Sequence, residues 1–173
     1  MSAISARLRT LSINSERASS PPQTNTSATD LSIPLPEHFI GRRFQLDAEA
    51  TLIDLPSGPR AWRFGSTGLN GAVVVDLETG HVLELVDTSG STTVFVNTSL
   101  KHFAATVQSV AERFPYYSEN ASDDEIEAVS DDLLRIVQAV DRDAAEADRY
   151  WSTVVDDARM GDLTTESILA IDH

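Results

Sequence analysis

Short apolar runs separated by turn residues fill the chain between residues 31 and 97. The run at residues 72–77 is the strongest, because Val73, Val74 and Val75 follow one another. Such a succession of β-branched residues is typical of a strand buried on both faces. The loop at residues 78–80 ends in a glycine that suits a tight hairpin. We therefore predict strands at residues 43–46, 51–55, 61–64, 72–77, 81–86 and 92–96, the last three of which form an antiparallel meander.

After this region the apolar residues recur at steps of three and four, which predicts amphipathic helices. The first predicted helix follows Thr98 and Ser99, which lie where an N-cap belongs, and it ends at Pro115. Its buried stripe consists of Leu100, Phe103, Val107, Val110 and Phe114.

A capping box predicts the start of the second helix. Ser122 is followed three residues later by Glu125, and this pair satisfies exposed amide groups at a helix start. The two aspartates between them suit the positive end of the helix dipole. The apolar stripe of this helix is Ile126, Val129, Leu133, Val137 and Val140.

A third helical stretch is expected at residues 144–160, with Gly161 as its stop and a last turn or two at residues 164–171. Its inward positions are Ala147, Tyr150, Trp151, Val154 and Ala158. Strands followed by helices indicate an α+β fold, with helices packed on one side of an antiparallel sheet and a helical C-terminal part. Residues 1–30 hold eleven serines or threonines and few apolar residues, so we expect a disordered tail there and a single domain at residues 31–173.

Negative charge is concentrated in the last third of the chain. The formal net charge is −14, and residues 119–173 hold sixteen acidic and four basic residues, a net of −12. Binding to phosphates requires a basic surface, so we expect no nucleic-acid partner. A solvated helix face explains this acidity, and so does a docking surface for a basic protein.

Composition excludes further classes of protein. The chain has no cysteine, which rules out disulfides, thiolate catalysis and cysteine-ligated zinc. No apolar run is long enough to cross a membrane, and the first residues lack the pattern of a secretory signal. We therefore expect a cytoplasmic protein.

No motif for catalysis, metal binding or cofactor binding is recognisable. No two of the four histidines are three to five residues apart, and HExxH is absent. The glycine-rich residues 65–71 lack the GxxxxGK[ST] pattern of a phosphate loop. The acidic run at residues 123–127 lacks the alternating ligands and central glycine of a calcium loop. We expect no enzyme activity, no metal and no cofactor.

Four segments of the chain follow one another in an order and spacing that resemble a known family. They are IPLP at residues 33–36, V-x-D-x-x-T-G-x-V at residues 74–82, FVNTSL at residues 95–100 followed by Phe103, and YWSTVV at residues 150–155. Together they are similar to the SUKH superfamily, and most similar to its fourth immunity-protein subfamily. The resemblance covers residues 31–163, and its matched residues look structural.

The resemblance implies an α+β domain that binds other proteins. Many bacterial SUKH proteins are immunity proteins in polymorphic toxin systems. They bind a cognate toxin, often a nuclease or a nucleic-acid deaminase, and neutralise it in the producing cell or its kin.

The leading hypothesis is therefore a bacterial immunity protein that binds a basic toxin domain through its acidic helical third. The candidate partner-binding residues are Asp123, Asp124, Glu125, Glu127, Asp131 and Asp132. The alternative is a non-catalytic interaction or scaffold module unrelated to toxin neutralisation.

Overall fold

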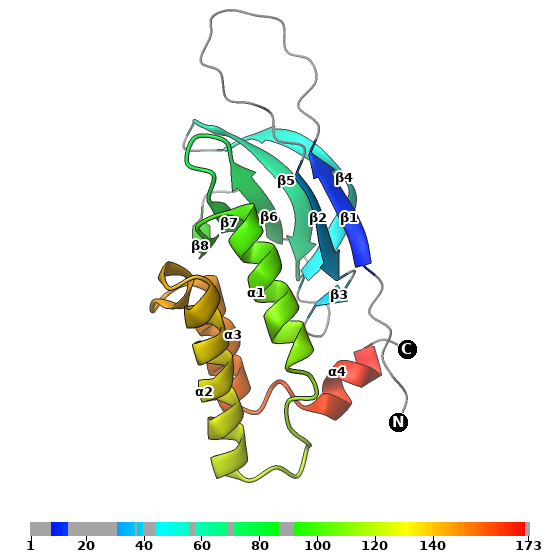
Figure 1. Ribbon diagram of the computed structural model, residues 1–173, viewed down its shortest axis with the longest axis vertical. Helices are drawn as coiled ribbons and strands as arrows, with labels where there is room; N and C mark the ends of the chain where they lie inside the picture. The colour runs from blue at the N-terminus through cyan, green and yellow to red at the C-terminus, as the bar shows by residue number, and fades with distance from the viewer. Residues whose placement is uncertain are drawn as a thin grey trace, which may run out of the picture.

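One layer of the protein is a six-stranded antiparallel sheet (Figure 1). The computed structural model describes residues 8–13, 31–36, 38–39, 44–55, 58–68, 71–86 and 92–171. Neighbouring strands of this sheet follow chain order, so the sheet is a meander. Its strands are β3 (His38–Phe39), β4 (Phe44–Asp54), β5 (Arg60–Thr67), β6 (Gly71–Asp76), β7 (Val82–Leu85) and β8 (Thr93–Asn97).

Two further strands, β1 (Leu8–Ile13) and β2 (Leu31–Pro36), form a separate antiparallel pair. β2 lies against the first helix, and β1 lies near β4. Residues 8–13, predicted to belong to a disordered tail, form a strand in the structure. Pairing with β2 supplies the backbone hydrogen-bond partners that this short segment lacks by itself. The remainder of the predicted tail lies outside the described residues.

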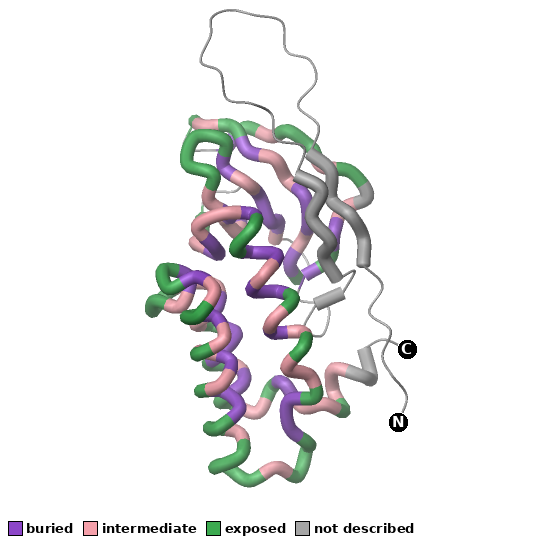
Figure 2. The backbone as a smooth tube through the Cα atoms, viewed as in Figure 1, coloured by how far each residue is buried: buried purple, intermediate pink, exposed green. Residues whose placement is uncertain are grey.

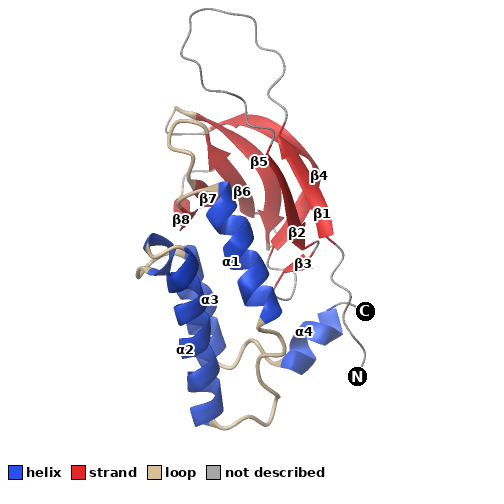
Figure 3. Ribbon diagram, viewed as in Figure 1, coloured by secondary structure: helices blue, strands red, loops and turns tan. Residues whose placement is uncertain are grey.

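The C-terminal part of the chain is helical. The helix α1 lies across the sheet, and α2 and α3 run side by side in opposite directions next to it (Figures 1 and 3). The predicted α+β class, with an antiparallel meander and a helical C-terminal part, is confirmed. The helices are α1 (Leu100–Glu112), α2 (Asp123–Val140), the 3₁₀ turn η1 (Asp143–Ala145), α3 (Tyr150–Arg159) and α4 (Thr165–Ile171).

The strands predicted at residues 43–46 and 51–55 are one long strand, β4. It pairs with β5 on both sides of an irregularity, with Leu46 opposite Gly65 and Thr51 opposite Arg63. Residues 47–50 therefore lie opposite the single residue Phe64, and this mismatch between the two strands is a β-bulge. Because this segment consists of acidic and alanine residues, a prediction from apolar runs divides the strand in two.

The third predicted helix starts later than the apolar pattern indicates. Helix α3 begins at Tyr150, and Ala147, predicted to face inward, is exposed. Asp148 has a φ of 61°, which is not a helical conformation, and it separates α3 from η1. The hydroxyl of Ser152 accepts a hydrogen bond from the Arg149 N–H at 3.1 Å and so satisfies a free amide at the new helix start.

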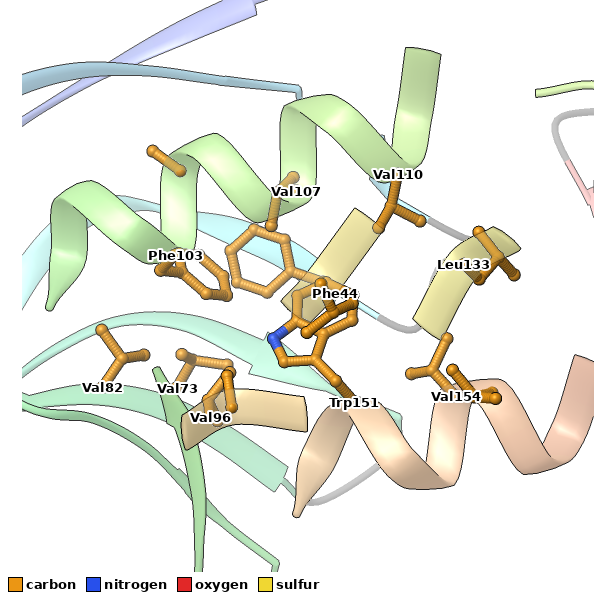
Figure 4. Close-up of a cluster of buried hydrophobic side chains, with 14 of the residues drawn as sticks. Phe44, Val73, Val82, Val96, Phe103, Val107, Val110, Leu133, Trp151 and Val154 are labelled. Carbon is orange, nitrogen blue, oxygen red and sulfur yellow. The ribbon is translucent and has the colours of Figure 1, made fainter. Parts of the chain in front are cut away.

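The main core lies between the sheet and the helices (Figures 2 and 4). Phe103 of α1 packs edge to face against two phenylalanines of the sheet, with ring centroids 5.3 Å from Phe44 and 5.6 Å from Phe64. Aromatic pairs favour this geometry over a face-to-face stack. Leu133 of α2 and Trp151 of α3 belong to the same core, so the helical layer and the sheet share one hydrophobic interior.

β6 is buried on both faces, as the three consecutive valines predict. Val73 belongs to the main core, whereas Val74 belongs to a smaller cluster on the opposite face of the sheet. That smaller cluster consists of Leu55, Ala61, Ala72, Val74 and Leu85.

Replacing Leu133 by alanine is expected to lower the free energy of unfolding by about 2–5 kcal/mol, because a leucine that is 1% exposed leaves a cavity in the core. The matched control is Met160→Ala, which removes a side chain that is 69% exposed and is expected to change the free energy by less than about 0.5 kcal/mol. Urea unfolding curves measure both values. Equal effects of the two substitutions would contradict this assignment of the core.

Candidate functional site

The antiparallel pair of helices α2 and α3 carries the acidic surface of the protein. In α2, Val129, Leu133 and Val137 face the core, while the six acidic residues lie in the first ten residues of the helix, at positions outside this buried stripe. Figure 2 shows the outer side of α2 as largely exposed. The 3.6-residue period of the apolar side chains therefore turns the charged side chains toward solvent.

Glu125, one of the six predicted partner-binding residues, is engaged at the start of α2. Its carboxylate accepts a hydrogen bond from the Ser122 N–H at 2.9 Å, and the Ser122 hydroxyl accepts one from the Glu125 N–H at 3.4 Å. The backbone and hydroxyl bonds from Ser122 lower the pKa of Glu125 below its usual value, since both stabilise the charged form. The predicted capping box is confirmed.

Asp131 and Asp132 form ion pairs that tie α2 to its neighbours. Asp131 pairs with Arg159 of α3 at 3.2 Å. Asp132 pairs with Arg113, at the end of α1, at 2.7 Å and with Arg135 at 3.2 Å. The two aspartates thus face different sides of α2, and the six predicted residues do not form one continuous face.

Asp123, Asp124 and Glu127 are exposed, and no residue in the described part of the chain forms an ion pair with them. Asp123 and Asp124 lie in the first turn of α2, where the helix dipole favours negative charge. Glu127 lies beyond that turn and is four residues from both Asp123 and Asp131, so it adds like-charge repulsion. Of the six predicted residues, these three are the ones whose carboxylates form neither an ion pair nor a capping hydrogen bond with the described residues.

A buried carboxylate, Asp141, fixes the other end of α2. Asp141 is the C-cap residue of the helix and is 4% exposed. One of its oxygens accepts hydrogen bonds from the Thr98 N–H at 2.8 Å, the Asn97 side-chain amide at 2.9 Å and the Thr98 hydroxyl at 3.1 Å. The end of α2 is thereby joined to the turn between β8 and α1.

Asn97 extends this network to α3. Its side-chain oxygen accepts a hydrogen bond from the indole N–H of Trp151 at 3.0 Å, and its amide also donates to the Thr106 hydroxyl at 3.3 Å. Asn97 is fully buried and Trp151 nearly so. We call Asn97, Thr98, Thr106, Asp141 and Trp151 the polar network.

The network keeps Asp141 ionised despite its burial. Burial raises the pKa of Asp141, but the hydrogen bonds from the Thr98 N–H, the Asn97 amide and the Thr98 hydroxyl, together with the nearby His102 ring, outweigh that effect. Its pKa therefore lies below its usual value of 3.8. Every buried nitrogen or oxygen of the described side chains has a hydrogen-bond partner.

The two histidines whose side chains the structure describes make structural contacts. The Nδ1 atom of His102 lies 2.6 Å from the Thr98 hydroxyl, and the His81 ring packs edge to face on Phe95. The motif residue Asp76 accepts bonds from the Glu78 N–H and the Thr79 hydroxyl, which shapes the β6–β7 turn. Gly80 ends that turn with a φ of 75°, a conformation that glycine adopts readily.

The described residues hold neither a metal-binding cluster nor a membrane-crossing helix. No group of three or more histidine, aspartate or glutamate side chains there is arranged to hold a metal ion. No helix in that part of the chain has the length and apolar character that a membrane crossing needs.

The fold defines the class of the protein. It is an α+β domain whose motif residues build turns, caps and a core network. The family model of the SUKH-4 immunity proteins matches residues 16–157, which is most of the chain. The chain belongs to the SUKH-4 immunity protein family, as the sequence resemblance indicates. Membership implies an immunity function directed against a toxin. No curated protein matches the chain, and no solved structure does.

Some members of the polar network are recognisable in the sequence, but the hydrogen bonds that join them are not. Asn97 and Trp151 belong to segments that resemble the family, and the structure shows that these two segments bond to each other. Asp141 was missed, because a carboxylate at the C-terminus of a helix opposes the helix dipole and reads as an exposed residue. One signal for the network was available in the sequence: Asn97 ends a strand and directly precedes the residues that lie where an N-cap belongs.

Replacing Asn97 by alanine is expected to lower the free energy of unfolding by about 2–4 kcal/mol. It removes the Asn97 oxygen that accepts from the Trp151 N–H and takes one donor from Asp141, and a lost partner of a buried polar group costs about 1–3 kcal/mol. Urea unfolding measures the loss, with the exposed Thr153→Ala as the control. A loss as small as that of the control would contradict the role of the network.

The contribution of Asp141 to stability is expected to depend on pH. Its folded pKa lies below 3.8, so its stabilising effect is fully present above that value and is lost as the pH falls through the folded pKa. Unfolding free energies of the natural chain and of Asp141→Asn should differ by a constant amount above about pH 5 and converge below it. A difference that persists unchanged at about pH 3 would contradict this role.

Proposed function

We propose that this chain is a bacterial immunity protein that binds and neutralises, in the cytoplasm, a cognate toxin acting on nucleic acid, either a nuclease or a nucleic-acid deaminase. The observation that carries the proposal is its membership of the SUKH-4 immunity family combined with a helical third of net charge −12. A toxin that acts on nucleic acid holds phosphates in a basic groove. An acidic protein surface is complementary to such a groove.

The helical third has too few basic residues to neutralise its acidic ones, which supports an outward-directed negative potential. Arg135, Arg149 and Arg159 each pair with an acidic residue close by. Residues 119–173 have one further base, Arg142, so most of their sixteen acidic residues stay uncompensated. Uncompensated charge of one sign steers an oppositely charged partner and raises the association rate.

Within this surface, Asp123, Asp124 and Glu127 form the proposed centre of attraction, because they are exposed and their charges are free of described ion pairs. Asp131 and Asp132 contribute negative charge at the sides of α2, although Arg159, Arg113 and Arg135 partly neutralise it. Glu125 contributes mainly by stabilising the start of α2. The binding surface thus rests on a helix whose ends are both fixed.

Replacing Asp124 and Glu127 together by lysine is expected to slow association with the toxin by roughly ten-fold at low salt, because charge reversal removes electrostatic steering. The difference between this variant and the natural chain should shrink as salt screens the charges. Surface plasmon resonance at several salt concentrations measures the association rate, using the toxin domain encoded by the neighbouring gene in catalytically inactive form.

The matched control replaces Glu78 and Glu112 by lysine, which changes the net charge by the same amount at exposed positions outside α2. Equal slowing by both variants would mean that overall charge alone matters and would reject α2 as the contact surface. Co-expression with the active toxin domain tests the function itself. Rescue of growth supports an immunity protein, whereas a scaffold module unrelated to the toxin would leave the cells unprotected.

A further inference from the structure

In the described part of the chain, one edge of the six-stranded sheet has no pairing strand along Thr51–Asp54, at the end of β4. Among the described residues, the only strand on the outer side of β4 is β3, which pairs with Phe44 and Gln45 and no further. β1 lies near β4 but pairs with β2. The strand at the opposite edge, β8, instead packs against η1 and α3. An edge strand with unpaired N–H and C=O groups is a template for another strand.

The direction of the backbone groups at this edge follows from the β4–β5 hairpin. The Leu55 N–H donates to the Pro59 carbonyl, so this pair is hydrogen-bonded, and the hydrogen-bonded pairs alternate from there along an antiparallel ladder. Ile53 and Thr51 therefore bond toward β5, while Leu52 and Asp54 turn their N–H and C=O groups outward. The Arg60 carbonyl, opposite Asp54, accepts from Leu77 of the next segment, which agrees with this alternation.

An apolar side chain lies beside these outward groups. Leu52 is 41% exposed and is one of the few large hydrophobic residues with that much exposure in the described chain. It stands directly opposite Trp62, which is half-buried, so the two side chains project from the same face of the sheet. A strand added next to β4 places one of its own side chains against Leu52.

The charges of β4 distinguish between possible occupants of this edge. β4 contains Asp47, Glu49 and Asp54 and no basic residue; Asp47 is already paired with Arg63 of β5 at 3.0 Å, whereas Glu49 and Asp54 form no ion pair with the described residues. A second copy of the chain would bring these acids against their own equivalents, and each chain carries a net charge of −14. A basic strand meets the same acids with opposite charge.

We propose that the Thr51–Asp54 edge binds an extended, basic segment of the toxin by β-augmentation, with Leu52 as its apolar contact. This inference rests on the proposed function and adds a contact that the acidic helices do not supply. The backbone groups of Leu52 and Asp54 give the added strand its hydrogen bonds, and the side chain of Leu52 selects its residue.

Amide hydrogen exchange, followed by NMR, tests the proposal on the full chain. The probe is the inactive toxin domain encoded by the neighbouring gene. The Leu52 and Asp54 N–H groups are expected to exchange roughly ten-fold or more slowly in the complex than in the free chain, since the added strand pairs them. The N–H of Ile53 already bonds to β5 and is the internal control, whose exchange should change much less.

Two variants at one position separate the backbone from the side chain. Leu52→Pro removes an outward N–H and leaves the bonds to β5 in place, and edge strands tolerate proline at such positions. It is expected to weaken binding by roughly ten-fold or more, whereas Leu52→Ala keeps the N–H and should have a smaller effect. Equal losses, or none, would overturn the proposed strand pairing. If Leu52→Pro does not fold, the exchange measurement on the natural chain decides.

The outcomes also separate this inference from the proposed function. Growth rescue with unchanged exchange at Leu52 and Asp54 rejects the edge as a binding site and leaves the immunity function standing. Protection of these two amides together with rescue supports both. Absence of both rescue and binding rejects the immunity function and, with it, the strand pairing.

Discussion

The placement of α2 relative to the sheet and α1 depends on the bonds made to one buried carboxylate, Asp141. Burying a charge is costly, and the cost is offset only when good hydrogen bonds surround it. Here the donors come from Asn97 and Thr98, at the end of β8 and just before α1. Moving α2 away from the sheet would leave the charge of Asp141 unpaired, so the position of α2 relative to the sheet is strongly determined.

The same network sets the position of α3, because Asn97 bonds to Trp151 as well as to Asp141. α2 and α3 are therefore held at their adjacent ends by one buried asparagine, while Arg159 and Asp131 pair further along the two helices. A rigid pair of helices presents its charges at fixed positions, which limits the entropy lost when a partner binds. Internal polarity and external charge thus have separate roles: the buried groups orient the helices, and the exposed acids give them an electrostatic character.

Three local signals in the sequence predicted the structure correctly. The capping box at Ser122 and Glu125, the glycine of the β6–β7 turn and the valine run of β6 each depend on neighbouring residues, and each formed as expected. Prediction from the sequence failed where a distant partner decides the outcome. The segment Leu8–Ile13 becomes a strand only because Leu31–Pro36 pairs with it, and the long strand β4 passes through a bulge that no apolar pattern reveals. For the candidate site, the charge was predictable, but the pairing of Asp131 and Asp132 with arginines from other elements required the fold.

The segments that resemble the family and the acids proposed to contact a partner are different sets of residues, and this separation has a physical basis. Asp76, Asn97 and Trp151 shape a turn and a buried network, so their replacement affects the frame of the domain. Asp124 and Glu127 make no described contact that the frame needs, so they are free to differ when the partner differs. A family whose members meet different toxins requires both properties in one domain: an interior that tolerates little change, and a surface whose charges change without loss of the fold.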